Sequence, residues 1–179
     1  MSERHTVGRY LGGEETTKPR ELVYGFVREP PAPVYGHQSV VFRLGRLLDD
    51  EVRRLGAGVV ALSPLDVVLD PERALIVQPD VVFVAAARRG IIRDQIWGAP
   101  DLVAEVLSRR TARRDRTIKL GWYRRYGVGE CWFADPRVRT VEVVSLATGG
   151  GVSLFQRDAP LVSAVLPGLR LPASAIFET

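Results

Sequence analysis

The sequence contains few of the residues that cross-link a chain or bind zinc. It has one cysteine, Cys131, and two histidines, His5 and His37, among 179 residues. A single cysteine excludes an internal disulfide, and because Cys131 lies in an apolar run we expect a buried thiol without a chemical role. Two histidines without further well-placed partners do not have the spacing of a zinc site. Disulfide-rich and zinc-stabilised folds are therefore excluded.

Long apolar runs and low-complexity tracts are also missing. The longest apolar stretches, such as 81–87, are well short of the roughly 18 residues that cross a membrane, and the N-terminus lacks the apolar core of a signal peptide. The 12 prolines and 17 glycines are scattered as turn residues. We therefore expect a cytoplasmic protein that does not bind membranes, with a loose N-terminal arm at 1–18 and a single domain at 19–179.

Lysine is scarce although the chain is basic. Of 25 basic residues only Lys18 and Lys119 are lysines, and the net charge is +4. Residues 88–125 contain eleven basic and four acidic residues, a net charge of +7, so the rest of the chain is acidic. Arginine offers a planar fork of donors to phosphate oxygens, so this segment suits a nucleic-acid backbone. An ordinary solvated face is an equally good explanation.

Hydrophobic spacing predicts an α/β fold. Residues 40–55 and 112–126 have the period of helices, and Gly56 and Gly127 can end them. Apolar segments separated by turn residues predict strands at 22–27, 58–62, 65–69, 75–87, 101–107, 130–134 and 140–146, with short edge strands at 152–155 and 169–171. The segment 75–87 is long enough for a central strand with its continuation. This order predicts an α/β sandwich with a central mixed β-sheet and two main helices.

Two carboxylates, Asp80 and Glu105, lie within apolar strand segments. An ionised group in such a place is costly unless a metal, a cation or hydrogen bonds compensate. The period of a strand puts Val103, Glu105 and Leu107 on one face, so Glu105 can meet Asp80 across neighbouring strands. Two carboxylates and a backbone carbonyl would form a magnesium or manganese site. Alternatively, Asp80 caps a turn and Glu105 pairs with an arginine.

Lys119 stands out because arginine fills nearly every other basic position. The protonation of a lysine can be tuned by burial, which suits it to orient an attacking water or to stabilise a developing charge. The alternative is a pair with Asp115, four residues earlier, on a solvated helix face.

His37 and three aromatic residues have simpler explanations. A histidine at the start of a helix can be a metal ligand or a general base, but we favour a surface or helix N-terminal role for His37. Trp122, Tyr123 and Tyr126 could stack on nucleobases, yet their helical spacing favours core packing.

One stretch of the sequence resembles a known family. Its residues are Ala99-Pro-Asp-Leu-Val-Ala-Glu-Val-Leu-Ser108, then Thr111, Arg113-Arg-Asp115, Lys119-Leu120, Tyr123, Gly127-Val128, Trp132 and Asp135-Pro136. In this register the chain resembles the Uma family, bacterial proteins described as candidate restriction endonucleases. Glu21-Leu22, Gly25, the prolines before His37 and Gln78-Pro79-Asp80 agree as well. The resemblance covers residues 20–177 and is loose outside 101–136.

The resemblance implies a restriction-endonuclease-like fold of the PD-(D/E)xK type. It makes Asp80 and Glu105 the two acids that bind magnesium or manganese, with the carbonyl of Val106. The superfamily lysine two residues after Glu105 is missing, because Leu107 stands there. The resemblance makes Lys119 the substitute, positioned by Asp115.

Further residues are implied to support the site or to bind nucleic acid. Glu21 is a possible third acid, and Gln78 precedes the Pro-Asp pair. Arg109 and Arg110 stand where the family often has Pro-Ser, which makes this loop more basic. With Arg113 and Arg114 they are the candidates for binding a nucleic acid.

These observations lead to three hypotheses. The first is a magnesium-dependent endonuclease that hydrolyses DNA, for which the resemblance makes a homodimer plausible. The second is a noncatalytic protein that keeps the fold and binds nucleic acid or a partner through the basic segment. The third is a structural homodimer in which the acids only balance arginines.

Overall fold

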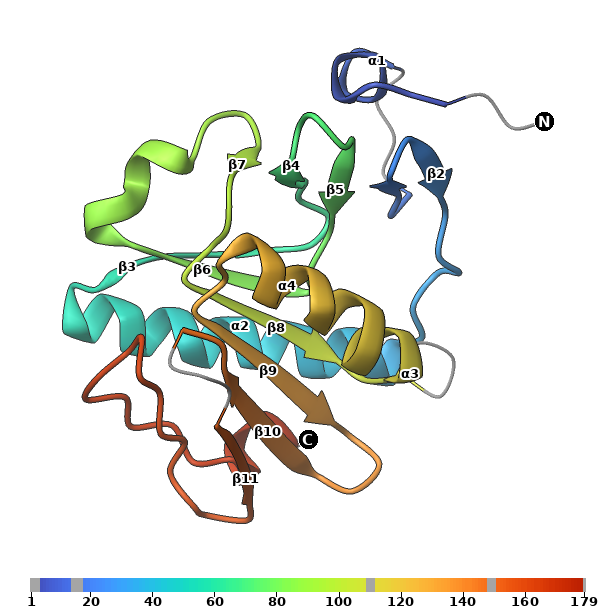
Figure 1. The fold of residues 1–179 in the computed structure, drawn as a ribbon. Helices are drawn as coiled ribbons and strands as arrows, with labels where there is room; N and C mark the ends of the chain where they lie inside the picture. Colours follow the sequence, from blue (N-terminus) through green and yellow to red (C-terminus); the bar gives the residue numbers. More distant parts are fainter. Residues whose placement is uncertain (1–3, 14–17, 109–111, 148–150, 179) are drawn as a thin grey trace.

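Two β-sheets form the body of the protein (Figure 1). The computed structural model describes residues 4–13, 18–108, 112–147 and 151–178. One sheet has six strands in the order β11-β10-β9-β8-β6-β3, and the other has five in the order β2-β1-β5-β4-β7. The strands are β1 (Glu21–Val23), β2 (Phe26–Arg28), β3 (Gly58–Leu62), β4 (Val67–Asp70), β5 (Leu75–Val77), β6 (Val81–Ala85), β7 (Ile96–Trp97), β8 (Leu102–Val106), β9 (Glu130–Asp135), β10 (Thr140–Ser145) and β11 (Val152–Gln156).

The six-stranded sheet is mixed, as the sequence predicted. β8 pairs with β9 in parallel, whereas β6 pairs with β8, and β9 with β10, in antiparallel. All five residues of β8 are buried, which fits a central strand covered on both faces. β8 therefore carries Glu105 through the middle of the molecule.

The helix α2 (Tyr35–Leu55) covers one face of this sheet. Its buried residues Val41, Leu44 and Leu48 recur at helical spacing and pack in one cluster with side chains of β6, β8, β9 and β10. Gly56 ends the helix in the left-handed conformation, with φ of 59°. The helix begins five residues earlier than the spacing predicted, so that His37 lies in its first turn.

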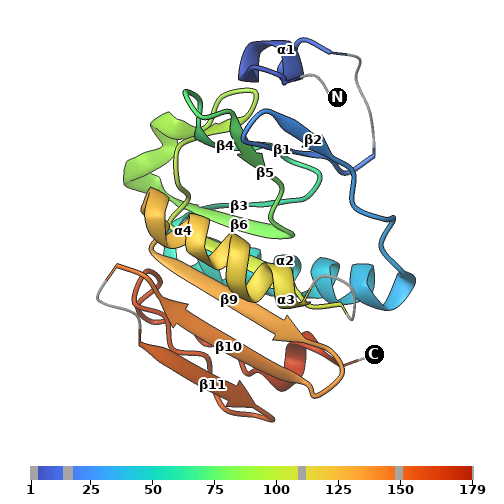
Figure 2. The same ribbon diagram turned by 45° about the vertical axis from the view of Figure 1, so that its right-hand side comes forward.

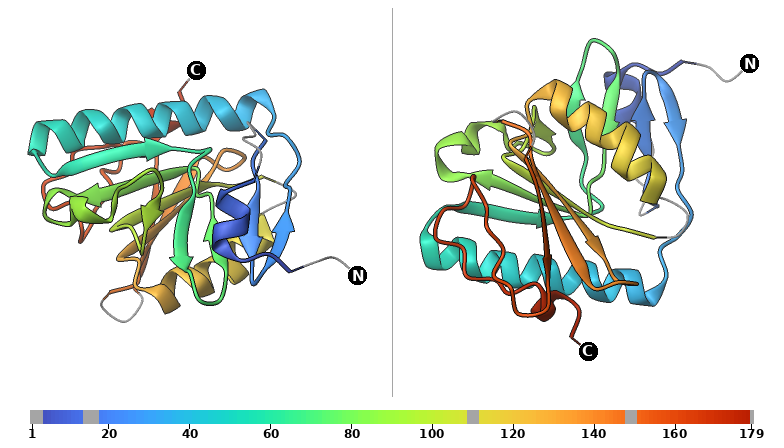
Figure 3. Two further views of the ribbon diagram at one scale, coloured as in Figure 1. Left: turned by 90° about the horizontal axis from the view of Figure 1, so that it is seen from above. Right: turned by 60° about the horizontal axis from the view of Figure 1, so that its bottom comes forward.

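A second helical stretch covers the opposite face. It consists of α3 (Ala112–Arg114), a π-helical segment (Asp115–Lys119) and α4 (Leu120–Tyr126). Figure 2 shows α3 and α4 in front of the sheet, and the left view of Figure 3 shows α2 along the other side. Trp122 and Tyr123 are buried in a cluster with side chains of both sheets, which confirms that they belong to the core. The predicted pair of flanking helices is confirmed.

The prediction of one strand over 75–87 is wrong. The chain leaves the five-stranded sheet after β5, passes through Gln78-Pro79-Asp80 and enters the six-stranded sheet as β6. Pro79 has no N–H to donate to a ladder, so it breaks a strand that the apolar residues alone would continue. After β6 the residues Ala86–Ile91 form a 3-10 helix. The break places Asp80 at the start of β6.

The second sheet was not foreseen. The segment 22–27, expected as one strand, is a hairpin of β1 and β2 whose turn residues Tyr24 and Gly25 have φ of 51° and 89°. Two successive positive φ values are typical of the turn that joins short antiparallel strands. Glycine supplies the second of them without strain.

The expectation of a loose arm at 1–18 is wrong for α1 (Val7–Leu11). Val7 and Tyr10 are buried against Leu22 and Ile76 of the five-stranded sheet. The Tyr10 hydroxyl donates to the Arg20 carbonyl at 2.8 Å. A single helical turn is too short for its spacing to be read from the sequence.

The C-terminal part also differs from expectation. Residues 169–171 form no strand, and their leucines instead pack into the cluster below α2. A 3-10 helix (Ser174–Ile176) follows. No helix within the described ranges is long and apolar enough to span a membrane.

Candidate functional site

Pairing of β6 with β8 brings Asp80 and Glu105 together. Val81 lies opposite Ala104 in this antiparallel pair, so Asp80, one residue before Val81, lies beside Glu105, one residue after Ala104. The Asp80 carboxylate accepts a hydrogen bond of 2.7 Å from the backbone N–H of Val106. The two acids therefore meet across neighbouring strands, and Asp80 also lies beside the backbone of Val106.

Lys119 reaches Glu105 from the helical stretch that covers the sheet on the side opposite α2. Its side chain is buried, and Nζ lies 2.9 Å from Glu105 Oε1, 3.1 Å from Glu21 Oε1 and 3.9 Å from Asp115 Oδ1. The π-helical segment holds both Asp115 and Lys119. In such a segment each hydrogen bond spans one residue more than in an α-helix, and such segments often occur at functional sites. The alternative of a solvated pair with Asp115 is thereby wrong, because both side chains are buried.

Burial and crowding shift the protonation of this cluster. Burial raises the pKa of Glu105 to about 8; Lys119 counteracts this, and Asp115 and Asp80 add to it. The Tyr123 hydroxyl donates a hydrogen bond to the same carboxylate. Burial alone would lower the pKa of Lys119, but Glu105 and Glu21 raise it well above its ordinary value. Lys119 is therefore a cation at every physiological pH.

Glu21 joins the cluster from β1 of the other sheet. Burial works against its ionised form, yet Lys119 and Arg114 together lower its pKa. Arg114 donates to Glu21 Oε2 at 2.7 Å. The backbone N–H of Gln78 donates to Glu21 Oε1 at 3.4 Å, while the Gln78 side chain accepts from the backbone N–H of Arg20 at 3.2 Å. Glu21 and Gln78 thus link the second sheet to Lys119.

Sequence reasoning underestimated His37. Its Nε2 lies 3.4 Å from Asp80 Oδ2, and its ring is hydrogen-bonded to the Val106 backbone. Burial would lower the pKa of His37, but these contacts raise it. Two of its neighbours are thus groups that the resemblance made metal ligands. The cluster of Pro30, Pro31 and Pro33 was the available clue, because prolines break regular structure and the helix begins soon after them, at Tyr35.

A groove of about 580 Å³ contains these residues. Asp80, Glu105, Asp115 and Lys119 line it together with His37, and Pro30, Pro31 and Pro33 form an apolar wall. The proline-rich segment therefore shapes one side of the groove, and the charged cluster forms another.

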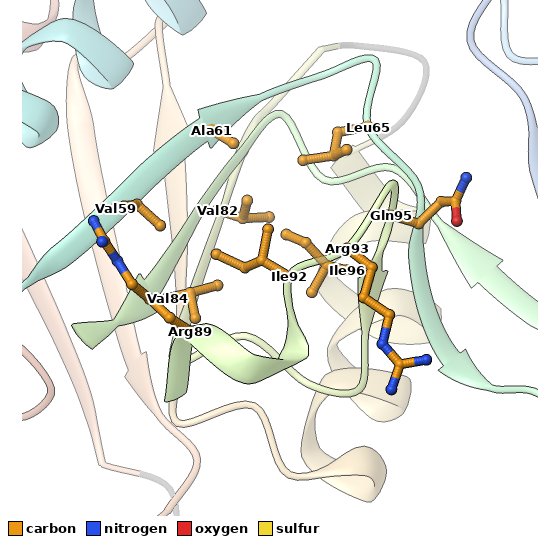
Figure 4. A pocket seen from close by; sticks show the side chains of 10 residues that line it. All are labelled: Val59, Ala61, Leu65, Val82, Val84, Arg89, Ile92, Arg93, Gln95 and Ile96. Atoms are coloured by element: carbon orange, nitrogen blue, oxygen red, sulfur yellow. The ribbon is translucent and has the colours of Figure 1, made fainter. Parts of the chain in front are cut away.

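A second pocket, of about 430 Å³, is apolar and contains none of the predicted site residues. Figure 4 shows the aliphatic side chains of Val59, Val82, Val84 and Ile92 at its centre and the charged ends of Arg89 and Arg93 at its periphery. It has no acidic side chain in its wall, so it is not the site that the sequence predicted.

The arginines of the basic segment are partly engaged within the protein. Arg114 pairs with Glu21 and lies over the Trp122 ring, and Arg116 pairs with Glu142. Arg113 is exposed. Arg109 and Arg110 lie outside the described residues. The charge that the sequence offers to a nucleic acid is therefore smaller than a count of arginines indicates.

The donor set suits a divalent ion of the magnesium type. Within the described ranges no three histidine, cysteine, aspartate or glutamate side chains form a preformed metal group. Magnesium is usually held by one or two carboxylates with carbonyls and waters, which Asp80, Glu105 and Val106 offer. Four buried or half-buried acids, Glu21, Asp80, Glu105 and Asp115, face the cations Lys119 and Arg114. A bound divalent cation would stabilise the ionised forms of these acids.

A comparison with solved structures identifies a protein of similar fold. A crystal structure of "a putative nuclease belonging to DUF820 from Anabaena variabilis" matches with a TM-score of 0.79 and 20% sequence identity, over 97% of each chain. At this identity the likeness is one of fold, and the expected restriction-endonuclease-like fold is confirmed. No curated protein matches the chain.

A family comparison identifies the sequence itself. The family model named Uma2, described as "Putative restriction endonuclease", matches residues 9–174, and this description supports a nuclease function in general. The match includes β1, β6, β8 and the helix that carries Lys119. Since the match spans most of the chain, the protein belongs to the Uma2 family.

Proposed function

We propose that this protein is a metal-dependent endonuclease that hydrolyses phosphodiester bonds of DNA. The observation that carries the proposal is the buried contact of Lys119 with Glu105, beside Asp80 in an open groove. Burying several charges is costly for stability, so a role in chemistry explains the cluster better than folding does.

The carboxylates of Asp80 and Glu105 and the carbonyl of Val106 are the proposed ligands of Mg²⁺ or Mn²⁺. When bound, the ion neutralises charge on the phosphodiester and makes water a better nucleophile. The backbone N–H of Val106 orients the Asp80 carboxylate for this task by donating to Oδ2. Glu105 is oriented by Tyr123 and Lys119.

Lys119 is proposed to stabilise negative charge that develops on the phosphate. Because its pKa is raised, it cannot accept a proton from water, so a general-base role does not suit it. Asp115 and Glu21 position its ammonium group. Leu107, at the position of the superfamily lysine, is buried in the core, and Lys119 supplies the missing charge from the helix.

Cleavage of plasmid and single-stranded DNA with Mg²⁺ or Mn²⁺ tests the proposal. We expect the wild-type protein and the control Lys18→Ala, at the other lysine, to cut DNA only when metal is present. Glu105→Gln and Lys119→Ala should lose at least about 100-fold in rate, the size expected when an electrostatic contribution is removed. Thermal unfolding of each variant shows whether it is folded, and Glu105→Gln keeps the shape of the side chain.

The same assay separates this function from the alternatives. Equal cutting by wild type and both site variants would contradict the assignment of the residues. No cutting by wild-type protein, together with salt-dependent DNA binding, would favour the noncatalytic protein. A homodimer and a cytoplasmic location stay predictions.

A further inference from the structure

We propose that His37 is a ligand of the metal ion through Nε2 and gives the site a preference for Mn²⁺ over Mg²⁺. The inference deepens the proposed function and rests on its metal site. It adds a nitrogen donor to a set of oxygen donors, and it concerns a residue that neither the family description nor the sequence pattern assigns to the metal.

The position of the imidazole carries the proposal. His37 lies in the first turn of α2, and its Nε2 is 3.4 Å from Asp80 Oδ2. The ring is also hydrogen-bonded to the backbone of Val106. One side chain therefore faces two of the three groups that are proposed to bind the ion.

The separation of the atoms suits a shared ion. Two atoms that each lie about 2.1 Å from one ion are about 3.0 Å apart at octahedral angles and about 3.4 Å apart at tetrahedral angles. The observed 3.4 Å between Nε2 and Oδ2 agrees with this range. Neither side chain needs to move far to share an ion.

The site also needs another side-chain donor. Glu105 is turned toward Lys119 and Tyr123, and its two oxygens lie 2.9 and 3.2 Å from Nζ of Lys119. In the described part of the chain no three histidine, cysteine, aspartate or glutamate side chains form a preformed group, so an ion held by Asp80 and His37 would also need the Val106 carbonyl and waters. His37 is a further donor in the same groove, and its Nε2 faces Asp80.

Nε2 is the ring nitrogen that faces the proposed metal ligands. Nδ1 of His37 is buried and has no hydrogen-bond partner among the described residues. The polar contacts of the ring are thus all directed at Asp80 and Val106. Imidazole suits transition ions better than it suits magnesium, which prefers oxygen ligands. A site that includes His37 should therefore discriminate between the two ions.

Direct binding measurements on the full chain test the proposal. We expect calorimetry to give a dissociation constant for Mn²⁺ at least tenfold lower than that for Mg²⁺. His37→Gln should weaken Mn²⁺ binding at least tenfold and Mg²⁺ binding less than threefold. The matched control is His5→Gln, which changes the other histidine of the chain. An equal loss for both ions would mean that His37 only positions Asp80, and would overturn the proposal.

Spin-echo modulation of bound Mn²⁺ gives a second readout that does not depend on affinity. A nitrogen-14 modulation is expected with wild type and with His5→Gln, and it should vanish in His37→Gln. Absence of this modulation in the wild-type protein would overturn the proposal even if His37→Gln weakened binding. A circular dichroism melt verifies that each variant is folded.

Failure of this inference differs from failure of the proposed function. Metal-dependent DNA cutting without a nitrogen signal would refute the role of His37 and leave the endonuclease intact. A nitrogen signal without cutting of any DNA would support the role of His37 and refute the endonuclease.

Discussion

Glu105 is a carboxylic acid enclosed by apolar strands, with two further acids close by. Burial, Asp115 and Asp80 keep its pKa near 8, far above that of an exposed glutamate. The folded state therefore holds the proton more tightly than the unfolded state. The stability that this proton provides is complete below the unfolded pKa and is lost as the pH rises through the folded pKa.

Raising the pH should therefore destabilise the metal-free protein. In metal-free buffer, the free energy of unfolding should fall between about pH 5.5 and about pH 8.5, with Glu105 contributing on the order of 1–3 kcal/mol of the fall. Glu105→Gln does not ionise, so its fall should be smaller by that amount. Denaturant unfolding at both pH values measures the difference. Parallel pH curves for the two proteins would show that Glu105 does not titrate in this window.

Three side chains at the site come from elements that are far apart in the sequence, so no local pattern predicts that they meet. Glu21, Glu105 and Lys119 lie on β1, β8 and the π-helical segment, yet Nζ of Lys119 is within 3.1 Å of both carboxylates. The sequence indicated Glu105 and Lys119 because an acid in an apolar strand and a rare lysine are unusual. Nothing local indicated that Glu21 would face them, because the distance between two sheets is a property of the fold.

At the scale of elements, α1 illustrates why short helices escape prediction. Five residues provide little helical period, and their stability comes from the sheet that they cover. Tyr10 is buried against Leu22 and Ile76, and its hydroxyl also lies 3.4 Å from Asp66. Burial raises the pKa of Tyr10, so this hydroxyl stays a donor.

The element-scale prediction concerns this contact. Tyr10→Ala should lower the free energy of unfolding by about 3 kcal/mol, since it removes a buried aromatic side chain. Gly8→Ala, in the same helix, meets nothing within 4 Å and is the matched control. It should be neutral or slightly stabilising, because alanine favours a helix. Chemical denaturation measures both variants. A loose arm would make Tyr10→Ala as silent as the control.

At the scale of the whole molecule, charge is distributed less simply than composition indicates. Arg88 pairs with Asp101 at 3.0 Å, and Arg114 and Arg116 pair with Glu21 and Glu142. Arginines that neutralise acids within the protein release fewer counterions from DNA. Among the described arginines at 113, 114 and 116, the exposed Arg113 is the best placed to contact a phosphate.

DNA binding by the Glu105→Gln protein as a function of salt tests this distribution. Arg113→Ala should reduce the slope of log affinity against log salt by about one, the value for one lost phosphate contact. Arg116→Ala should change the slope less, because its partner is Glu142. Fluorescence anisotropy measures both slopes. A larger effect of Arg116→Ala would mean that its ion pair opens when DNA binds.

Local sequence patterns were enough to predict the types of the main elements. Both long helices, the strand with Glu105 and the glycines that end the helices follow from local periodicity and backbone preference. The sequence also determined which acids were costly to bury, since that depends on their immediate neighbours.

How these parts meet depends on contacts between segments that are distant in the sequence. The break at Gln78-Pro79-Asp80 sends one apolar run into two sheets, and it sets Asp80 beside Val106 and His37. Glu21 reaches Lys119 from the second sheet. Such contacts arise from pairing between distant segments, whose register is fixed by the packing of the whole core rather than by the residues on either side.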